Sequence, residues 1–167
     1  MADMSKLKYT FFNRISGDDI PPDHPVGLFA SHWRALRGDR PIPERRNFSP
    51  AKVPFLLPYV VVLELMDTEE GLDLQTRLEG EYMISLTGKS NMGHSARHVM
   101  EEDGFLARLT EAQETLGTGE VQYSEIEAQD HKMKPHRLFR GVFPFLSNGK
   151  SLGQVFIVVG ESHLNLK

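Results

Sequence analysis

The chain has 167 residues and carries a formal net charge of −4, from 19 Lys and Arg against 23 Asp and Glu. A composition of 40% hydrophobic and 25% charged residues is typical of one globular domain with short extensions. The absence of cysteine excludes disulfides, cysteine-ligated metal clusters, a cysteine nucleophile and a thiol-linked chromophore. The acidic balance argues against nucleic-acid binding, and no apolar stretch approaches the about 18 residues of a membrane span. We therefore expect a cytoplasmic protein without nucleic-acid or membrane partners.

The N-terminal region divides into an arm and a helix. Residues 1–22 contain Gly17-Asp18-Asp19 and two prolines, so we expect a partly ordered arm. A helix is predicted over 23–38, capped by Asp23 and ended by Gly38. One face of this helix carries an apolar stripe, formed by Val26, Phe29, Trp33 and Leu36. The stripe can dock on the sheet of its own domain or on a second copy of the chain.

The remaining segments predict two strands, a helical middle and three further strands. Apolar or alternating patterns give strands over 59–66, 72–78, 121–128, 135–146 and 152–160. Helices are predicted over 49–57, 80–87 and 103–116, from Pro, Gly and apolar spacing. We predict an α+β fold, with a five-stranded antiparallel sheet, helices on one face and an added N-terminal helix. Residues 23–167 are then a single domain.

Several short motifs support a family resemblance. They are Trp33-Arg34-Ala35-Leu36-Arg37, Arg40 to Pro43, Pro50 to Pro58, Arg77-Leu78-Glu79-Gly80, Gly88 to Gly93, and Phe143-Pro144-Phe145-Leu146-Ser147. Together with the element order, they resemble a family of small bacterial stand-alone PAS-domain proteins, formerly a domain of unknown function. The resemblance covers roughly residues 25 to 163, and it departs from the family pattern at 88–93 and in the more polar third strand.

This resemblance implies a non-catalytic sensory or interaction module in signal transduction, with a small ligand or partner in the cleft between the helices and the sheet. It also implies a homodimer through the leading helix and a separate output protein, because the chain ends at Lys167 soon after the last strand. The dimer or partner candidates are Val26, Phe29, Trp33 and Leu36. The ligand-binding candidates are Arg77, Tyr82, His94, His98 and Phe143. The ligand stays unidentified; haem and flavin are open, without covalent thiol attachment, and no metal site is expected.

Other interpretations remain open at this point. His94 and His98 are four residues apart and would share a helical face suited to metal or haem iron, or else simply face solvent. A basic cluster formed by His131, Lys132, Lys134, His136 and Arg137 fits either an anion site or a solvated turn. A small cleft enzyme would use His94 or His136 as its base, although no catalytic motif is present. A purely structural PAS dimerisation module would have no pocket larger than a few waters.

Overall fold

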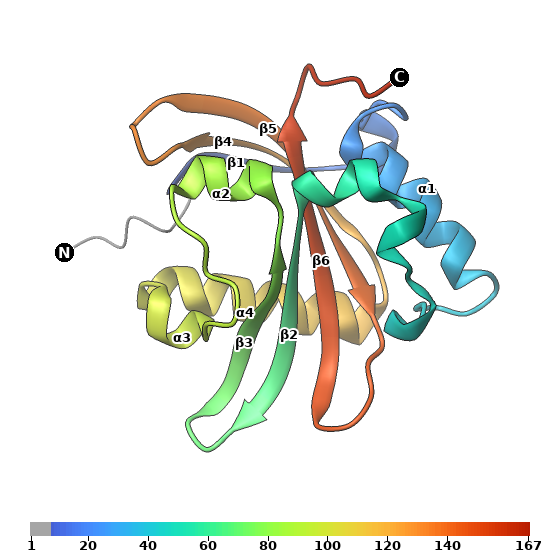
Figure 1. The fold of residues 1–167 in the computed structure, drawn as a ribbon, viewed down its shortest axis with the longest axis vertical. Helices are drawn as coiled ribbons and strands as arrows, with labels where there is room; N and C mark the ends of the chain where they lie inside the picture. Colours follow the sequence, from blue (N-terminus) through green and yellow to red (C-terminus); the bar gives the residue numbers. More distant parts are fainter. Residues whose placement is uncertain (1–7) are drawn as a thin grey trace.

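A computed structural model describes residues 8–167, and its centre is one strongly twisted antiparallel sheet (Figure 1). Six strands lie in the order β1-β4-β5-β6-β2-β3, and each neighbouring pair is antiparallel. The strands are β1 Lys8–Ile15, β2 Val60–Thr68, β3 Gly71–Glu79, β4 Gln122–Gln129, β5 Pro135–Phe145 and β6 Ser151–Glu161. The predicted α+β class and antiparallel sheet are therefore confirmed.

Within residues 8–167, three of the four α-helices occupy predicted segments. The four are α1 Pro25–Arg37, α2 Glu81–Thr87, α3 Ala96–Val99 and α4 Glu102–Thr118, with short 3-10 turns at Gly17–Asp19, Arg45–Asn47, Pro50–Lys52 and Pro54–Tyr59. Of these, α3 was not predicted, and it lies between the predicted helices 80–87 and 103–116. Among residues 8–167, no helix is both long and apolar enough to cross a membrane.

The sheet has one strand more than predicted, because part of the expected arm is the edge strand β1. This strand pairs with β4 along its length, from Lys8 opposite Gln129 to Ile15 opposite Tyr123. The register shifts between Tyr9 and Phe11, and such a bulge breaks the apolar–polar alternation by which a strand is recognised. The pairing partner also lies more than a hundred residues away. Residues 1–7 of the expected arm lie outside the described residues.

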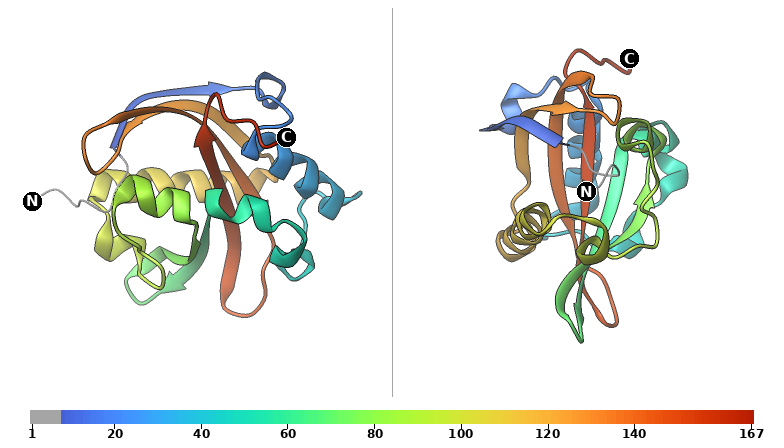
Figure 2. Two further views of the ribbon diagram at one scale, coloured as in Figure 1. Left: turned by 45° about the horizontal axis from the view of Figure 1, so that its top comes forward. Right: turned by 90° about the vertical axis from the view of Figure 1, so that its left-hand side faces the viewer.

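Helices cover both faces of the sheet, over two separate hydrophobic cores. Strand β2 contributes to both, since Val61, Leu63 and Leu65 lie in the core under α2 and α4, whereas Val60 and Val62 lie in the core under α1. We call the α2–α4 side the inner face and the α1 side the outer face. The two further views of Figure 2 show α1 and α2 on separate sides of the strands. The continuous apolar pattern of β2 follows from burial on both faces.

The apolar stripe of α1 packs on the outer face of its own sheet. Val26 and Phe29 have no exposed surface, and Trp33 is 4% exposed. The indole Nε1 of Trp33 donates a hydrogen bond to the carbonyl oxygen of Pro144 over 2.9 Å. Leu36 packs at the margin of the same core. The intramolecular alternative is thus the one found, and a second copy cannot reach Val26, Phe29 or Trp33 while α1 is docked.

The N-cap of α1 differs from the prediction. His24, rather than Asp23, is the capping residue, and its Nδ1 accepts from the backbone N–H of Val26 over 3.1 Å. Its Nε2 lies 2.9 Å from the carbonyl oxygen of Glu161 at the end of β6. Burial lowers the pKa of His24, so the neutral ring both accepts at the helix end and donates to the sheet. Tertiary contact with β6 therefore selects the cap.

Candidate functional site

A cavity of about 590 Å³ lies between the inner face of the sheet and α2–α4. Its sheet side is apolar and is formed by Val61 and Leu63 of β2 with Ile157 and Val159 of β6. Its helix side is also largely apolar and includes Met83, Ala96, Val99, Met100, Gly104 and Ala107. Water fills about 30 Å³ per molecule in the liquid, so the space suits a small organic molecule rather than a few waters.

One corner of this cavity is cationic. Arg140 of β5 is 1% exposed and forms a bidentate pair with Glu111 of α4, with both N···O distances 2.6 Å. Arg108 of α4 reaches the same carboxylate through Nη1 at 3.4 Å. The same Nη1 donates to the hydroxyl of Tyr9 over 3.4 Å. Tyr9, Arg108 and Arg140 line the cavity, and we call these three residues the arginine corner.

Glu111 stays ionised in this corner. Its burial would raise the pKa, but Arg140, Arg108 and the more distant Arg14 outweigh burial and hold the pKa below its usual range. The carboxylate raises the pKa of Arg140 despite complete burial. Two guanidinium groups therefore share one carboxylate at the cavity wall, which leaves an excess of positive charge there.

The hairpin between β4 and β5 forms part of the cavity rim. Its residues Gln129, Asp130, His131 and Met133 line the cavity. The backbone N–H of His131 donates to the carbonyl oxygen of Leu86 over 2.8 Å, and the His131 ring packs on Gly88. Gly88 has a φ of +80°, and a Cβ there would lie 2.7 Å from the ring. Glycine at the end of α2 thus allows the hairpin tip to close against the helix.

The comparisons with known proteins agree with this architecture. A family model described as a PAS domain matches residues 23–136, which is more than half of the chain. The chain belongs to the PAS-domain family. The match ends at the start of β5, so most of β5 and all of β6 follow the matched segment. No curated protein and no solved structure matches the chain significantly.

Beside the cavity of this PAS domain, His136 lies between two carboxylates. Its Nε2 is 2.9 Å from Oδ2 of Asp130, and its Nδ1 is 3.1 Å from Oε1 of Glu161. Burial would lower the pKa of His136, but these two contacts outweigh it and raise the pKa. The hydrogen bond from His136 and two backbone N–H groups lower the pKa of Asp130 to about 2. The protonated ring joins the β4–β5 turn to the end of β6.

We predict that this cluster makes stability depend on pH. Since the folded pKa of His136 lies above 6.5, its contribution is fully present below pH 6.5 and is lost as pH rises through the folded pKa. His136→Gln should remove that dependence. Urea unfolding of both proteins between about pH 5.5 and 8.5 measures the difference, which should shrink as pH rises. Taking the difference cancels the opposite effect of His24 and His32, whose pKa values burial lowers. A difference that is constant over this range would contradict the assignment.

The five ligand-binding candidates from the sequence do not line the cavity. Phe143 lies on the outer face with its ring 4.8 Å from that of Phe29, because the side chains of β5 alternate and this aromatic set faces α1. Arg77 is exposed, and its Nε donates to Oε1 of Glu64 over 2.7 Å. Tyr82 packs beside the inner core; burial raises its pKa, and its hydroxyl is buried without a partner among the described residues.

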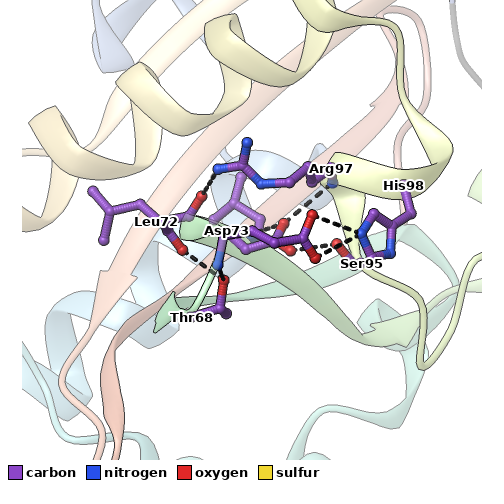
Figure 3. A network of polar contacts seen from close by, with 9 residues as sticks. Thr68, Leu72, Asp73, Ser95, Arg97 and His98 are labelled. Atoms are coloured by element: carbon purple, nitrogen blue, oxygen red, sulfur yellow. Dashed lines mark hydrogen bonds and ion pairs between the residues drawn. The ribbon is translucent and has the colours of Figure 1, made fainter.

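The two histidine candidates lie near the β2–β3 hairpin rather than in the cavity. His98 is on α3 and its Nε2 contacts Glu70 at 3.1 Å, in the network drawn in Figure 3. There the Asp73 carboxylate accepts from Ser95 and from the backbone N–H of Arg97, which anchors α3 to β3. His94 is exposed and precedes α3, so the two rings do not share a helix. Within residues 8–167, no three His, Asp or Glu side chains cluster as a metal site would require.

Sequence reasoning missed the arginine corner. One signal was available, because Arg140 stands between Leu138 and Val142 on the apolar face of an alternating strand. A charge at such a position needs a buried partner. Glu111 could be that partner, since it borders the apolar stripe of α4. The pairing of Glu111 with Arg140, 29 residues later, cannot be predicted from the spacing of the residues. Tyr9 carried no signal, because β1 was not recognised as a strand.

Proposed function

We propose that this PAS domain is a non-catalytic sensor that binds a small ligand in the cavity between α2–α4 and the inner face. The single observation that carries the proposal is the cavity of about 590 Å³, with an apolar lining and a few convergent polar groups. A purely structural module, the alternative left open by the sequence, would fill this space with side chains. The cavity volume favours a ligand-binding domain over that alternative.

The signal would leave the cavity through the sheet or through β1. The sequence suggested that a ligand would act on the leading helix, but α1 packs on the outer face, away from the cavity. Tyr9 of β1 lines the cavity and contacts Arg108. A bound ligand would therefore bias the position of the edge strand β1 directly, and any effect on α1 would have to cross β5 and β6.

The remaining parts of the proposal concern partners and chemistry. A homodimer or a separate output protein in the cytoplasm would receive the signal, and its contacts would lie outside the buried stripe of α1.

A sensory rather than catalytic role is supported by the positions of the two histidines considered as bases. His94 is exposed outside the cavity, and His136 is held between Asp130 and Glu161. Neither is among the cavity-lining residues.

We predict that Ala107→Trp abolishes ligand binding. Ala107 is an exposed residue of α4 at the cavity, so an indole there would fill the entrance without disturbing the core. Native mass spectrometry and the absorbance spectrum of the purified protein should reveal a bound molecule, including haem or flavin. Thermal shifts against metabolite pools cover ligands lost in purification. The matched control is Gln113→Trp, on the same helix but outside the cavity lining. Equal ligand content and shifts in both variants, or catalytic turnover of a bound metabolite, would contradict the proposal.

A further inference from the structure

Arg108 has donors from which no group within residues 8–167 accepts a hydrogen bond. Both of its polar contacts, to Tyr9 and to Glu111, run through Nη1 at 3.4 Å. Among residues 8–167, its Nη2 and Nε therefore have no hydrogen-bond acceptor. The side chain is 16% exposed, and the residue lines the cavity. A donor that is largely removed from water and lacks a partner costs free energy. A ligand oxygen that accepts from these guanidinium donors would therefore be stabilised here.

Arg140 adds a second unused donor in the same place. The side chain is 1% exposed, and its Nε is buried without a partner in the described part of the chain. Its other two nitrogens are both occupied by Glu111. The carboxylate thus compensates one of two guanidinium charges. An anionic oxygen at this wall would balance the second charge and could accept from the free nitrogens of Arg108 in the planar, paired geometry that carboxylates favour.

The rest of the cavity lining limits where an anion can lie. Three acidic residues besides the arginine corner line the cavity, namely Glu79, Glu101 and Asp130. Asp130 is held by His136, and Glu79 accepts from the backbone N–H of Asn91 over 2.7 Å. These carboxylates would repel an anion placed beside them. Between the charged groups lie the apolar side chains of β2, β6 and the helices, where the hydrophobic effect favours an apolar body.

We infer that the ligand of this cavity is an amphipathic carboxylate, whose acidic head binds the arginine corner and whose apolar body lies over the inner face of the sheet. The inference rests on the proposed ligand-binding function and names the chemical class that the cavity accepts. Neutral molecules of the same shape lack the group that balances Arg108.

The test compares acids with the alcohols of the same skeleton. Decanoate and 4-phenylbutyrate are titrated by calorimetry into the full chain, beside decanol and 4-phenylbutanol. We expect each acid to bind at least about tenfold more tightly than its alcohol, since a charge-assisted pair is worth more than a neutral hydrogen bond. Arg108→Met, which keeps an apolar stem, should remove this advantage, so that acid and alcohol bind with similar affinity. Arg137→Met is the matched control, because Arg137 is 50% exposed and pairs with Glu125 outside the cavity.

Three outcomes would overturn the inference. Equal affinity of acid and alcohol for the unmodified chain would show that the cavity does not select an acidic group. An acid preference that persists in Arg108→Met would show that the acidic group binds outside the arginine corner. Binding of none of the four probes would exclude this ligand class. The proposed function is tested separately from this inference. If the unmodified chain retains a neutral molecule and Ala107→Trp does not, the cavity is still a ligand site, although its ligand is not a carboxylate.

Discussion

Replacing Glu111 with leucine is expected to lower the free energy of unfolding by about 3–5 kcal/mol. The variant leaves the guanidinium of Arg140 buried without the carboxylate that holds it at two distances of 2.6 Å. A buried charge without its partner loses the attraction that offset its removal from water. Urea denaturation followed by circular dichroism measures the change as a shift of the midpoint at constant slope.

The double variant Glu111→Leu with Arg140→Met is the control for this prediction. Removing both charges replaces the pair with apolar groups of similar volume, which is often neutral or stabilising relative to the ion pair. We expect the double variant to recover most of the lost stability. A single variant that costs less than about 1 kcal/mol would mean that solvent reaches Arg140, as for exposed ion pairs. A double variant as unstable as the single one would assign the loss to packing instead of charge.

Replacing Phe29 with alanine is expected to lower the free energy of unfolding by a similar amount, about 3–5 kcal/mol. Phe29 has no exposed surface and, like Trp33, is an aromatic residue of α1 that packs on the outer face. Its ring centroid lies 4.8 Å from that of Phe143 and 5.8 Å from that of Phe156. Truncation would open a cavity between the helix and the sheet that neighbouring rings cannot fill. Chemical denaturation measures the loss.

Leu36→Ala serves as the matched control on the same stripe. Leu36 is only partly buried at the end of α1, so its truncation removes less apolar contact and should cost less than half as much. A larger loss for Leu36→Ala than for Phe29→Ala would contradict the packing described here. Small-angle scattering on both variants adds an independent readout. If the stripe formed a dimer instead of an intramolecular core, Phe29→Ala would dissociate the protein before it unfolded.

The general place of the candidate ligand site could be predicted from the sequence, but its lining residues could not. The family resemblance implied a cleft between the helices and the sheet, and the cavity lies there. Choosing side chains required knowledge of which strand face turns toward the helices. Phe143 and Arg140 are three residues apart on β5, and alternation sends them to opposite faces. Nothing in the local pattern of β5 marks the aromatic face as the one covered by α1.

Local patterns by themselves determined most of the elements. The period of the stripe in α1, the two-sided apolar run of β2 and the Asn148-Gly149 turn between β5 and β6 are all readable from neighbouring residues. These signals arise within a few residues, where backbone geometry and side-chain period are coupled. The same signals gave the antiparallel α+β class and the family resemblance.

Contacts between distant segments decided the remaining features. β1 exists because β4 offers an edge more than a hundred residues away, and His24 caps α1 because Glu161 accepts from its other ring nitrogen. The arginine corner needs β5, α4 and β1 to meet at one wall. Each of these depends on burial and on partners supplied by the folded chain, which no local period encodes. The small acidic chain without cysteine is thus a PAS domain by its local patterns, and its cationic cavity wall is a product of tertiary structure.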